Sequence, residues 1–315
     1  MQSCELILRA DAPREEWLAV RNTGIGGSDA GVILGMNKWK SPFTLWAEKT
    51  GRAEPEDLSG NEAVYWGTKQ EPLVAERFYE ETGKKVKRRG TLRSRPYPWM
   101  LANVDRWVPE ENVGLEIKTT NAFSAAQWDG DEVPDSYYAQ CLHYMAVTGA
   151  DRWYIAVLIG GQDFRWKVIP RNEDDIRALE KAEVDFWQHV SDGTPPPVDG
   201  SDSTARTLSR MYRGEEEALE LPGEADALIA SYDEWTAAKK DAESHLQAVK
   251  NQLMAMMGEA ETATADGRKI TWKTGKPRET ISLSDVKKKD PASYDALKAA
   301  GLVKLSAPSR VFRVW

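Results

Sequence analysis

The apolar and polar positions of the first 195 residues follow two alternating patterns. Apolar residues recur every three or four positions in some segments, which predicts helices, and every second position in others, which predicts strands. The predicted helices cover residues 28–35, 41–51, 62–82, 134–148 and 173–190. The predicted strands cover residues 85–94, 99–108, 113–119, 152–159 and 163–169. This order of elements indicates an α/β (α+β) domain over residues 1–195, with a mixed central β-sheet flanked by helices.

The pattern changes after this domain. Residues 196–222 begin in a stretch rich in Pro, Gly, Ser and Asp and are predicted to be a linker. Within the C-terminal extension, residues 223–315, apolar residues step by threes and fours along 224–257 with one interruption at Lys239. That spacing predicts a helical hairpin arm or a coiled coil. A small β element is predicted from strands at 267–275 and 311–315.

Composition narrows the class of protein. A length of 315 residues and a hydrophobic content of 41% are sufficient for a sizeable core. The two cysteines, Cys4 and Cys141, have no zinc-ligand spacing and form no disulfide framework, which is typical of a reducing compartment. The N-terminus is too charged for a signal peptide, and no apolar run reaches membrane-spanning length. We therefore expect a soluble intracellular protein.

The formal net charge of -8 argues against a surface coated with cations for nucleic acid, but a focused basic groove stays compatible with it. One basic run spans residues 84–95 and contains Lys84, Lys85, Lys87, Arg88, Arg89, Arg93 and Arg95. Two interpretations are open for this run. It is either an edge strand protected by charge or a surface that contacts phosphates.

Two predicted strands carry charged residues close together. Alternation along 113–119 places Glu116 and Lys118 on one face of the strand, and Asp105 lies on the preceding predicted strand. For an isolated Glu-x-Lys, a solvated strand face is the ordinary explanation. The other polar residues of the domain decide whether that explanation is sufficient.

Two predicted helices place polar side chains on their apolar stripes. Glu71 shares its stripe with Val74 and Phe78, and a carboxylate there requires a metal or a cation such as arginine. Gln140 shares its stripe with Tyr137 and Tyr144. Gln140 either belongs to a site or hydrogen-bonds buried backbone, and the two tyrosines are expected to be core residues with a polar tip.

Glu71, Asp105 and Glu116 together suit a hard divalent ion, since Mg²⁺ prefers oxygen ligands. A lysine beside them can orient or deprotonate an attacking water, or neutralise charge on a phosphate. This combination of Lys118 with carboxylates is what metal-assisted phosphodiester hydrolysis requires. The three histidines of the chain form no competing zinc motif.

The spacing of "VD" at 104–105 and "EIK" at 116–118 resembles the PD-(D/E)xK nuclease superfamily. Three longer blocks are similar to the YqaJ-type viral recombinase domain, the group that includes phage lambda exonuclease. They are "RNTGIGGSDAGVILGMNKWKSPFTLWAEKTG" from residue 21, "WGTKQEPLVAERFYEETG" from residue 66 and "YYAQCLHYMAVTGADRWYIAVL" from residue 137. The resemblance covers about residues 14–192. Val104 departs from the superfamily pattern, where a proline is expected at a turn.

The resemblance implies a role for each matching residue. Asp105, Glu116 and the backbone carbonyl of Ile117 would bind Mg²⁺, with Mn²⁺ as a substitute, and Glu71 would complete the acidic set. Lys118 would position the nucleophilic water, while Tyr137 and Gln140 match the Tyr-x-x-Gln motif that supports the active site. Arg21 and Ser28 would receive a terminal 5′-phosphate. Apart from the resemblance, Lys87, Arg88 and Arg89 of the basic run complete the predicted DNA-binding set.

The function that this family implies is a 5′-to-3′ exonuclease on linear double-stranded DNA, leaving a 3′ single strand for recombination. Implied partners are DNA ends, a single-strand annealing protein and further copies of the chain, as in a trimeric ring. The expected location is the cytoplasm of a bacterium, infected by phage or not. Two alternatives stay open: an endonuclease of the same superfamily and a non-catalytic DNA-binding adaptor. The C-terminal extension either guides DNA or a partner, or packs on the first domain.

Overall fold

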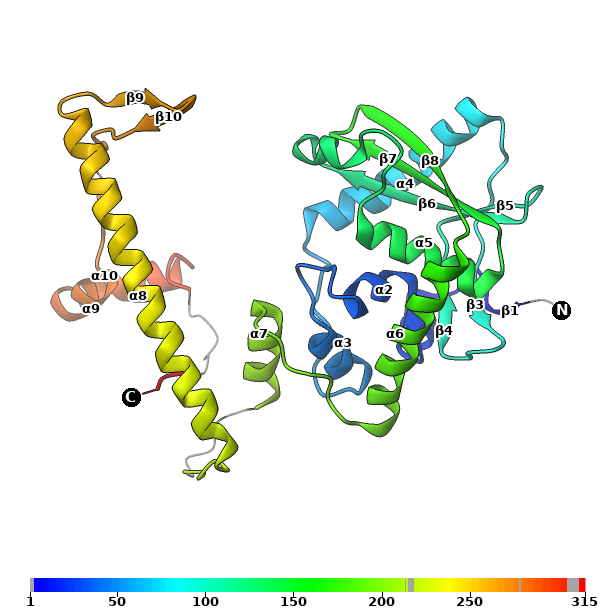
Figure 1. Ribbon diagram of the computed structural model, residues 1–315, viewed down its shortest axis with the longest axis horizontal. Coiled ribbons are helices and arrows are strands. Elements are labelled where there is room, and N and C mark those ends of the chain that lie inside the picture. Colours follow the sequence, from blue (N-terminus) through cyan, green and yellow to red (C-terminus); the bar gives the residue numbers. More distant parts are fainter. Residues whose placement is uncertain (1–2, 213, 215–217, 278, 305–311, 315) are drawn as a thin grey trace. The chain divides into compact units, whose positions relative to one another are not determined.

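A computed structural model describes residues 3–212, 214, 218–277, 279–304 and 312–314. The chain forms two compact units, residues 1–213 and 214–315 (Figure 1). The helices of the first unit are α1 (Arg14–Asn22), α2 (Gly27–Ile33), α3 (Pro42–Lys49), α4 (Glu62–Thr82), α5 (Asp135–Thr148), α6 (Glu173–Asp192) and α7 (Asp202–Met211), with a 3₁₀ helix η1 (Ala122–Trp128). Its strands are β1 (Cys4–Leu8), β2 (Ile25–Gly26), β3 (Thr91–Ser94), β4 (Met100–Ala102), β5 (Arg106–Val108), β6 (Val113–Thr120), β7 (Arg152–Ile159) and β8 (Asp163–Pro170).

The longest helix of this unit, α4, has the bounds that the sequence predicts. Asn61 caps its start by accepting hydrogen bonds from the N–H groups of Ala63 and Val64. Gly83 ends it with φ 70°, a conformation that glycine adopts without strain. The other predicted helices and the strands at β6, β7 and β8 are confirmed within a few residues.

The mixed α/β fold is confirmed, but the strands divide between two four-stranded sheets rather than one. The order is β1-β3-β4-β2 in the first sheet and β5-β6-β7-β8 in the second, and each mixes parallel and antiparallel pairs. The strand predicted over 99–108 is two strands, because the chain leaves the first sheet at Asn103 and joins the second at Arg106. The side chain of Asn103 accepts hydrogen bonds from Trp17 and Thr91, which holds the chain at this break.

Helices α4 and α5 cover opposite faces of the second sheet. Gln140 of α5 contacts Glu116 and Lys118 of β6, whereas Gly67 of α4 lies against Thr119. Even and odd positions of a strand point to opposite faces, so the two helices lie on different sides. The core between these layers contains buried aromatic and aliphatic residues, among them Phe78, Leu115, Trp153, Ile155 and Met145. The charged face of β6 is thus covered by α5 instead of water.

Part of the segment predicted as a linker, 196–222, forms helix α7 and packs against α3. The contact combines hydroxyl groups with two partly buried apolar residues, Leu208 and Met211, that pack against the core cluster of α3. Ser203 and Thr207 each lie 2.8 Å from the Thr44 hydroxyl, and Thr204 donates to Ser41 at 2.7 Å. Because α7 has only these two large apolar positions in its packed face, its apolar periodicity is weak in the sequence.

The second unit contains α8 (Glu224–Met257), a hairpin of β9 (Thr262–Ala265) and β10 (Arg268–Thr271), α9 (Leu283–Lys289) and α10 (Pro291–Ala299). Helix α8 agrees with the predicted arm, and β10 with the strand predicted at 267–275. The strand predicted at 311–315 falls partly outside the described residues, and residues 312–314 form none. No helix among the described residues has the length and apolarity needed to cross a membrane.

Candidate functional site

Strand pairing brings Asp105 and Glu116 together. Strands β5 and β6 are antiparallel with Arg106 opposite Leu115, so extending the register by one residue places Asp105 opposite Glu116. The Asp105 carboxylate accepts a hydrogen bond from the Ile117 N–H at 2.8 Å. The eleven-residue spacing between Asp105 and Glu116 is therefore explained by the β5–β6 hairpin, which brings the two acids opposite each other.

Lys118 and Gln140 connect these acids to α5. The Lys118 ammonium lies 2.6 Å from Glu116 and donates to the Gln140 side-chain oxygen at 2.9 Å. The Gln140 amide donates to Glu116 and to the Tyr144 hydroxyl, both at 2.8 Å. Tyr144 in turn donates to the Asn103 carbonyl at 2.9 Å. Gln140 and Tyr144, two of the polar residues that the sequence placed on the α5 stripe, therefore belong to one hydrogen-bond network.

The electrostatics of the site favour a bound cation. Burial and the neighbouring Glu116 raise the pKa of Asp105 well above its usual range. Burial alone would lower the pKa of Lys118, but Glu116 and Asp105 outweigh it and raise that pKa, so Lys118 is an ammonium. The second oxygen of Glu116 is buried without a hydrogen-bond partner. Two close carboxylates with one unsatisfied oxygen are a donor set that fits a divalent metal.

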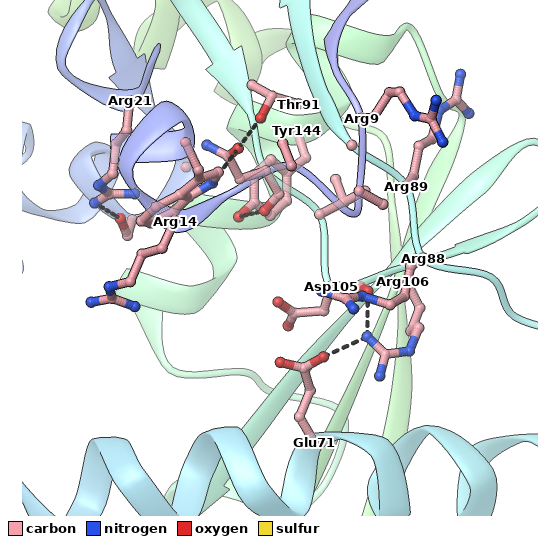
Figure 2. A pocket seen from close by; sticks show the side chains of 18 of the residues that line it. Arg9, Arg14, Arg21, Glu71, Arg88, Arg89, Thr91, Asp105, Arg106 and Tyr144 are labelled. Atoms are coloured by element: carbon pink, nitrogen blue, oxygen red, sulfur yellow. Dashed lines mark hydrogen bonds and ion pairs between the residues drawn. The ribbon is translucent and has the colours of Figure 1, made fainter. Parts of the chain in front are cut away.

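Glu71 lines the same cavity as Asp105, and its charge contributes to the raised pKa of that carboxyl. Its carboxylate forms an ion pair with Arg106, which also donates to the Asp105 carbonyl at 2.7 Å (Figure 2). Within the part of the chain that the structure describes, no three His, Cys, Asp or Glu side chains are arranged to hold a metal ion. The alternative partner considered for Glu71, an arginine, is therefore present, and its role as a metal ligand stays a prediction.

We expect Glu71→Gln to lower the thermal stability of the metal-free protein. The substitution leaves the Arg106 guanidinium, whose side chain is only 10% exposed, without its counter-charge. Because Glu71 itself is partly exposed, the expected loss is about 1–2 kcal/mol, less than for a fully buried pair. Thermal unfolding in EDTA measures it, with Glu76→Gln on an exposed position of the same helix as the control. An unchanged melting temperature would show that the pair contributes nothing to folding.

Arg21 and Ser28 are in contact, and their role in binding a 5′-phosphate stays a prediction. The Arg21 guanidinium donates to the Ser28 hydroxyl at 2.8 Å and lies 3.5 Å from the buried carboxylate of Asp29. Lys49 forms a second ion pair with Asp29 at 3.1 Å. Burial opposes ionisation of Asp29, but Lys49 and Arg21 outweigh it and lower its pKa. Asp29 is therefore a fixed anion that orients Arg21 toward Ser28.

Close packing of α2 on α5 depends on a glycine. A Cβ atom at Gly27 would lie 2.5 Å from the ring of Tyr144. That position therefore admits no side chain while Tyr144 keeps its place beside Gln140.

The predicted motif residue Tyr137 also lies beside Lys118. The Lys118 ammonium is 4.6 Å from the centre of the Tyr137 ring, and Trp128 stacks on that ring with a distance of 5.8 Å between ring centres.

The basic run divides into separate groups. Lys84 is paired with Glu111, and Arg93 and Arg95 are both paired with Glu5. Arg88 and Arg89 instead line a cavity of about 530 Å³ that also contains Asp105, Glu71, Arg21, Ser28 and Gln140. Lys87 is exposed and forms a backbone bridge with Trp107; it is not among the residues that line this cavity.

Several residues of this cavity were not predicted from the sequence. Arg9 and Arg14 line it from the end of β1 and the start of α1, and Arg106 neutralises Glu71. The signal for Arg106 was a charged residue at the start of a short strand whose other members are apolar. No local pattern points to Arg9 or Arg14, because both enter the site through tertiary packing.

The fold is similar to that of a solved enzyme structure. The chain matches an alkaline exonuclease from Laribacter hongkongensis with a TM-score of 0.50 and 23% identity, covering 57% of this chain and 94% of that one. The same enzyme in complex with dAMP matches with a TM-score of 0.50 and 20% identity, at the same coverage. The fold is therefore a nuclease fold.

A closer relative and a family model place the chain more narrowly. "Uncharacterized protein YqaJ" of Bacillus subtilis (strain 168) is 38% identical over 301 residues, which is 93% of each protein. Residues 16–151 match the model of the YqaJ-like viral recombinase domain. The chain belongs to this family, as its motifs predict.

Proposed function

We propose that the chain is a metal-dependent deoxyribonuclease, specifically a 5′-to-3′ exonuclease that degrades one strand of linear double-stranded DNA. The observation that carries this proposal is the shared cavity, because Asp105 and Gln140 line it together with Arg21 and Ser28. A terminal phosphate held by Arg21 and Ser28 would lie in the same cavity as Asp105 and Glu71. The remaining 3′ single strand serves recombination, in agreement with the description of the family as viral recombinases. The description of the fold neighbour as an alkaline exonuclease agrees as well.

Asp105, Glu116 and the Ile117 carbonyl are the residues that would hold Mg²⁺, or Mn²⁺ in its place. When bound, the metal would polarise the scissile phosphate and lower the pKa of a water molecule. Lys118, as an ammonium, orients the nucleophilic water and offsets negative charge on the phosphate. Gln140 holds the Lys118 and Glu116 side chains in position by forming a hydrogen bond to each of them.

The partners proposed for this activity are DNA ends, further copies of the chain and a single-strand annealing protein. A ring of copies, such as a trimer, would allow an acidic exterior to enclose a basic lining. The net charge of -8 is compatible with DNA binding in that arrangement. The cytoplasm of a bacterial or phage-infected cell is the proposed location.

Linear duplexes with 5′-phosphates are expected to be degraded faster than those with 5′-hydroxyls, and Arg21→Ala is expected to reduce that preference. A charge-assisted hydrogen bond from arginine to phosphate contributes about 1.5–3 kcal/mol. Release of nucleotides from end-labelled duplexes in Mg²⁺ measures the preference. Arg177→Ala, on an exposed part of α6, is the matched control.

Covalently closed circular DNA is expected to resist the enzyme in the same assay. Rapid cutting of such circles, without any effect of 5′-phosphorylation on linear DNA, would favour the endonuclease instead. Binding without hydrolysis of either substrate would favour the non-catalytic adaptor.

A further inference from the structure

The cavity contains two groups of arginines on two sides of Asp105 (Figure 2). Arg14 and Arg21 come from α1 and lie seven residues apart, which places them on one face of that helix. Arg9, Arg88 and Arg89 come from the ends of neighbouring strands. We refer to these groups as the helix arginines (Arg14, Arg21) and the strand arginines (Arg9, Arg88, Arg89).

Backbone contacts hold the strand arginines in place. In the β1–β3 ladder Leu8 pairs with Thr91, which brings Arg9 close to the segment that precedes β3. A Cβ atom at Gly90 would lie 1.8 Å from the Leu8 carbonyl oxygen, so only glycine permits this approach. On the other side, the Lys87 backbone exchanges two hydrogen bonds of 2.8 Å with Trp107. The segment is thus fixed from both sides.

The charges of the strand arginines differ in how far they are neutralised. Arg9 pairs with Asp11 at 3.1 Å, an exposed contact that contributes little. The Arg89 guanidinium lies 4.0 Å from the centre of the Trp107 ring. Neither Arg88 nor Arg89 forms an ion pair with any residue that the structure describes, in contrast to Lys84, Arg93 and Arg95 of the same run. The positive charge of the run is therefore left uncompensated where it lines the cavity.

We infer that the strand arginines bind the phosphodiester backbone of the DNA strand on the 3′ side of the scissile bond, with Arg88 as the exposed contact. This inference rests on the proposed function. A strand whose terminal 5′-phosphate lies at Arg21 and whose scissile phosphate lies at Asp105 continues away from the helix arginines. Figure 2 shows the strand arginines on the other side of Asp105 from the helix arginines, where the continuing strand would pass them. Arginine suits the task because its planar guanidinium donates two parallel hydrogen bonds to one phosphate.

Arg88→Ala separates this subsite from the terminal-phosphate site. In EDTA, which prevents hydrolysis, we expect a fluorescent 5′-phosphorylated duplex to bind about tenfold more weakly than to the parent, the effect of one charge-assisted contact. The slope of log K against log[salt] should decrease by about one, because about one fewer counterion is released. The ratio of affinities for 5′-phosphate and 5′-hydroxyl duplexes should not change. Binding of a deoxynucleoside 5′-monophosphate, which has no 3′ phosphodiester, should not change either.

Three further variants complete the test. Arg88→Lys should recover part of the affinity and the full salt slope, because it keeps the charge and loses the planar donor pair. Arg95→Ala removes a paired arginine of the same run outside the cavity and should bind as the parent does. Arg21→Ala should lose the 5′-phosphate ratio and the mononucleotide instead.

Two results would overturn the inference. One is unchanged duplex affinity and salt slope in Arg88→Ala. The other is a loss of the 5′-phosphate ratio or of mononucleotide binding in Arg88→Ala, which would assign this residue to the terminal site. Failure of the proposed function is detected separately, as the absence of nucleotide release by the parent protein in Mg²⁺.

Discussion

Replacement of either acid at the β5–β6 pair, Asp105→Ala or Glu116→Ala, is expected to abolish DNA hydrolysis. Each change removes a carboxylate from the donor set that fits the metal, and the loss of several kcal/mol of transition-state stabilisation corresponds to at least about a thousandfold in rate. Glu116 also accepts hydrogen bonds from both Lys118 and Gln140, so its removal releases the two side chains that orient the reaction. Nucleotide release from linear duplex DNA in Mg²⁺ measures the effect.

The fold should survive the loss of the Asp105 charge. The pKa of Asp105 is raised in the folded chain, so the ionised carboxylate opposes folding at neutral pH. Asp105→Asn, which keeps an acceptor for the Ile117 N–H, is therefore expected to melt at or above the temperature of the parent in EDTA. Near-normal turnover in either alanine variant would show that the active site has been assigned to the wrong residues.

Lys118→Ala is expected to lose most of the rate while keeping the metal. Lys118 is an ammonium between Glu116 and Gln140, and an ammonium donates hydrogen bonds but cannot coordinate a cation. Its contribution to positioning and charge is about 10²–10⁴ in rate, the range found for general acid–base groups. Its removal also takes away a positive charge that competes with the metal for Glu116, so metal affinity should stay equal or increase.

Isothermal calorimetry with Mg²⁺ or Mn²⁺ separates these two effects, and single-turnover hydrolysis gives the rate. Lys181→Ala, on an exposed position of α6, controls for the loss of one positive charge. Loss of metal binding together with the rate would contradict the division of roles between Lys118 and the carboxylates.

The sequence predicted the parts of this molecule that depend on local pattern. Helix α4 has an apolar stripe, an Asn cap and a terminal Gly, and its bounds agree with the structure. The alternation of β6 correctly placed Glu116 and Lys118 on one face. Parts that depend on non-local pairing were missed. Strand β1 is short and half exposed, and the division of 99–108 between two sheets leaves no trace in the alternation.

The same distinction applies to the candidate site. Polar residues on apolar stripes pointed to Glu71 and Gln140, because burial of a polar group requires a partner. An arginine was one expected partner of Glu71, but which arginine was not predictable, and the partners of Gln140 were not predictable either. Gln140 joins Glu116 and Lys118, whereas Glu71 joins Arg106 from the opposite helical layer. The arrangement of the second sheet between α4 and α5 determines which residues Glu71 and Gln140 contact.

The contact between Gly27 and Tyr144 has a consequence for how the site can vary. Residue 27 contributes no side-chain atom, yet the space it leaves is filled by the ring that supports Gln140. A methyl group added there would displace α5, and with it the amide that joins Glu116 to Lys118. Positions 27 and 144 therefore constrain each other across more than a hundred residues of sequence. A larger residue at one is compatible with the network only if the other becomes smaller and a new donor or acceptor replaces the lost hydroxyl.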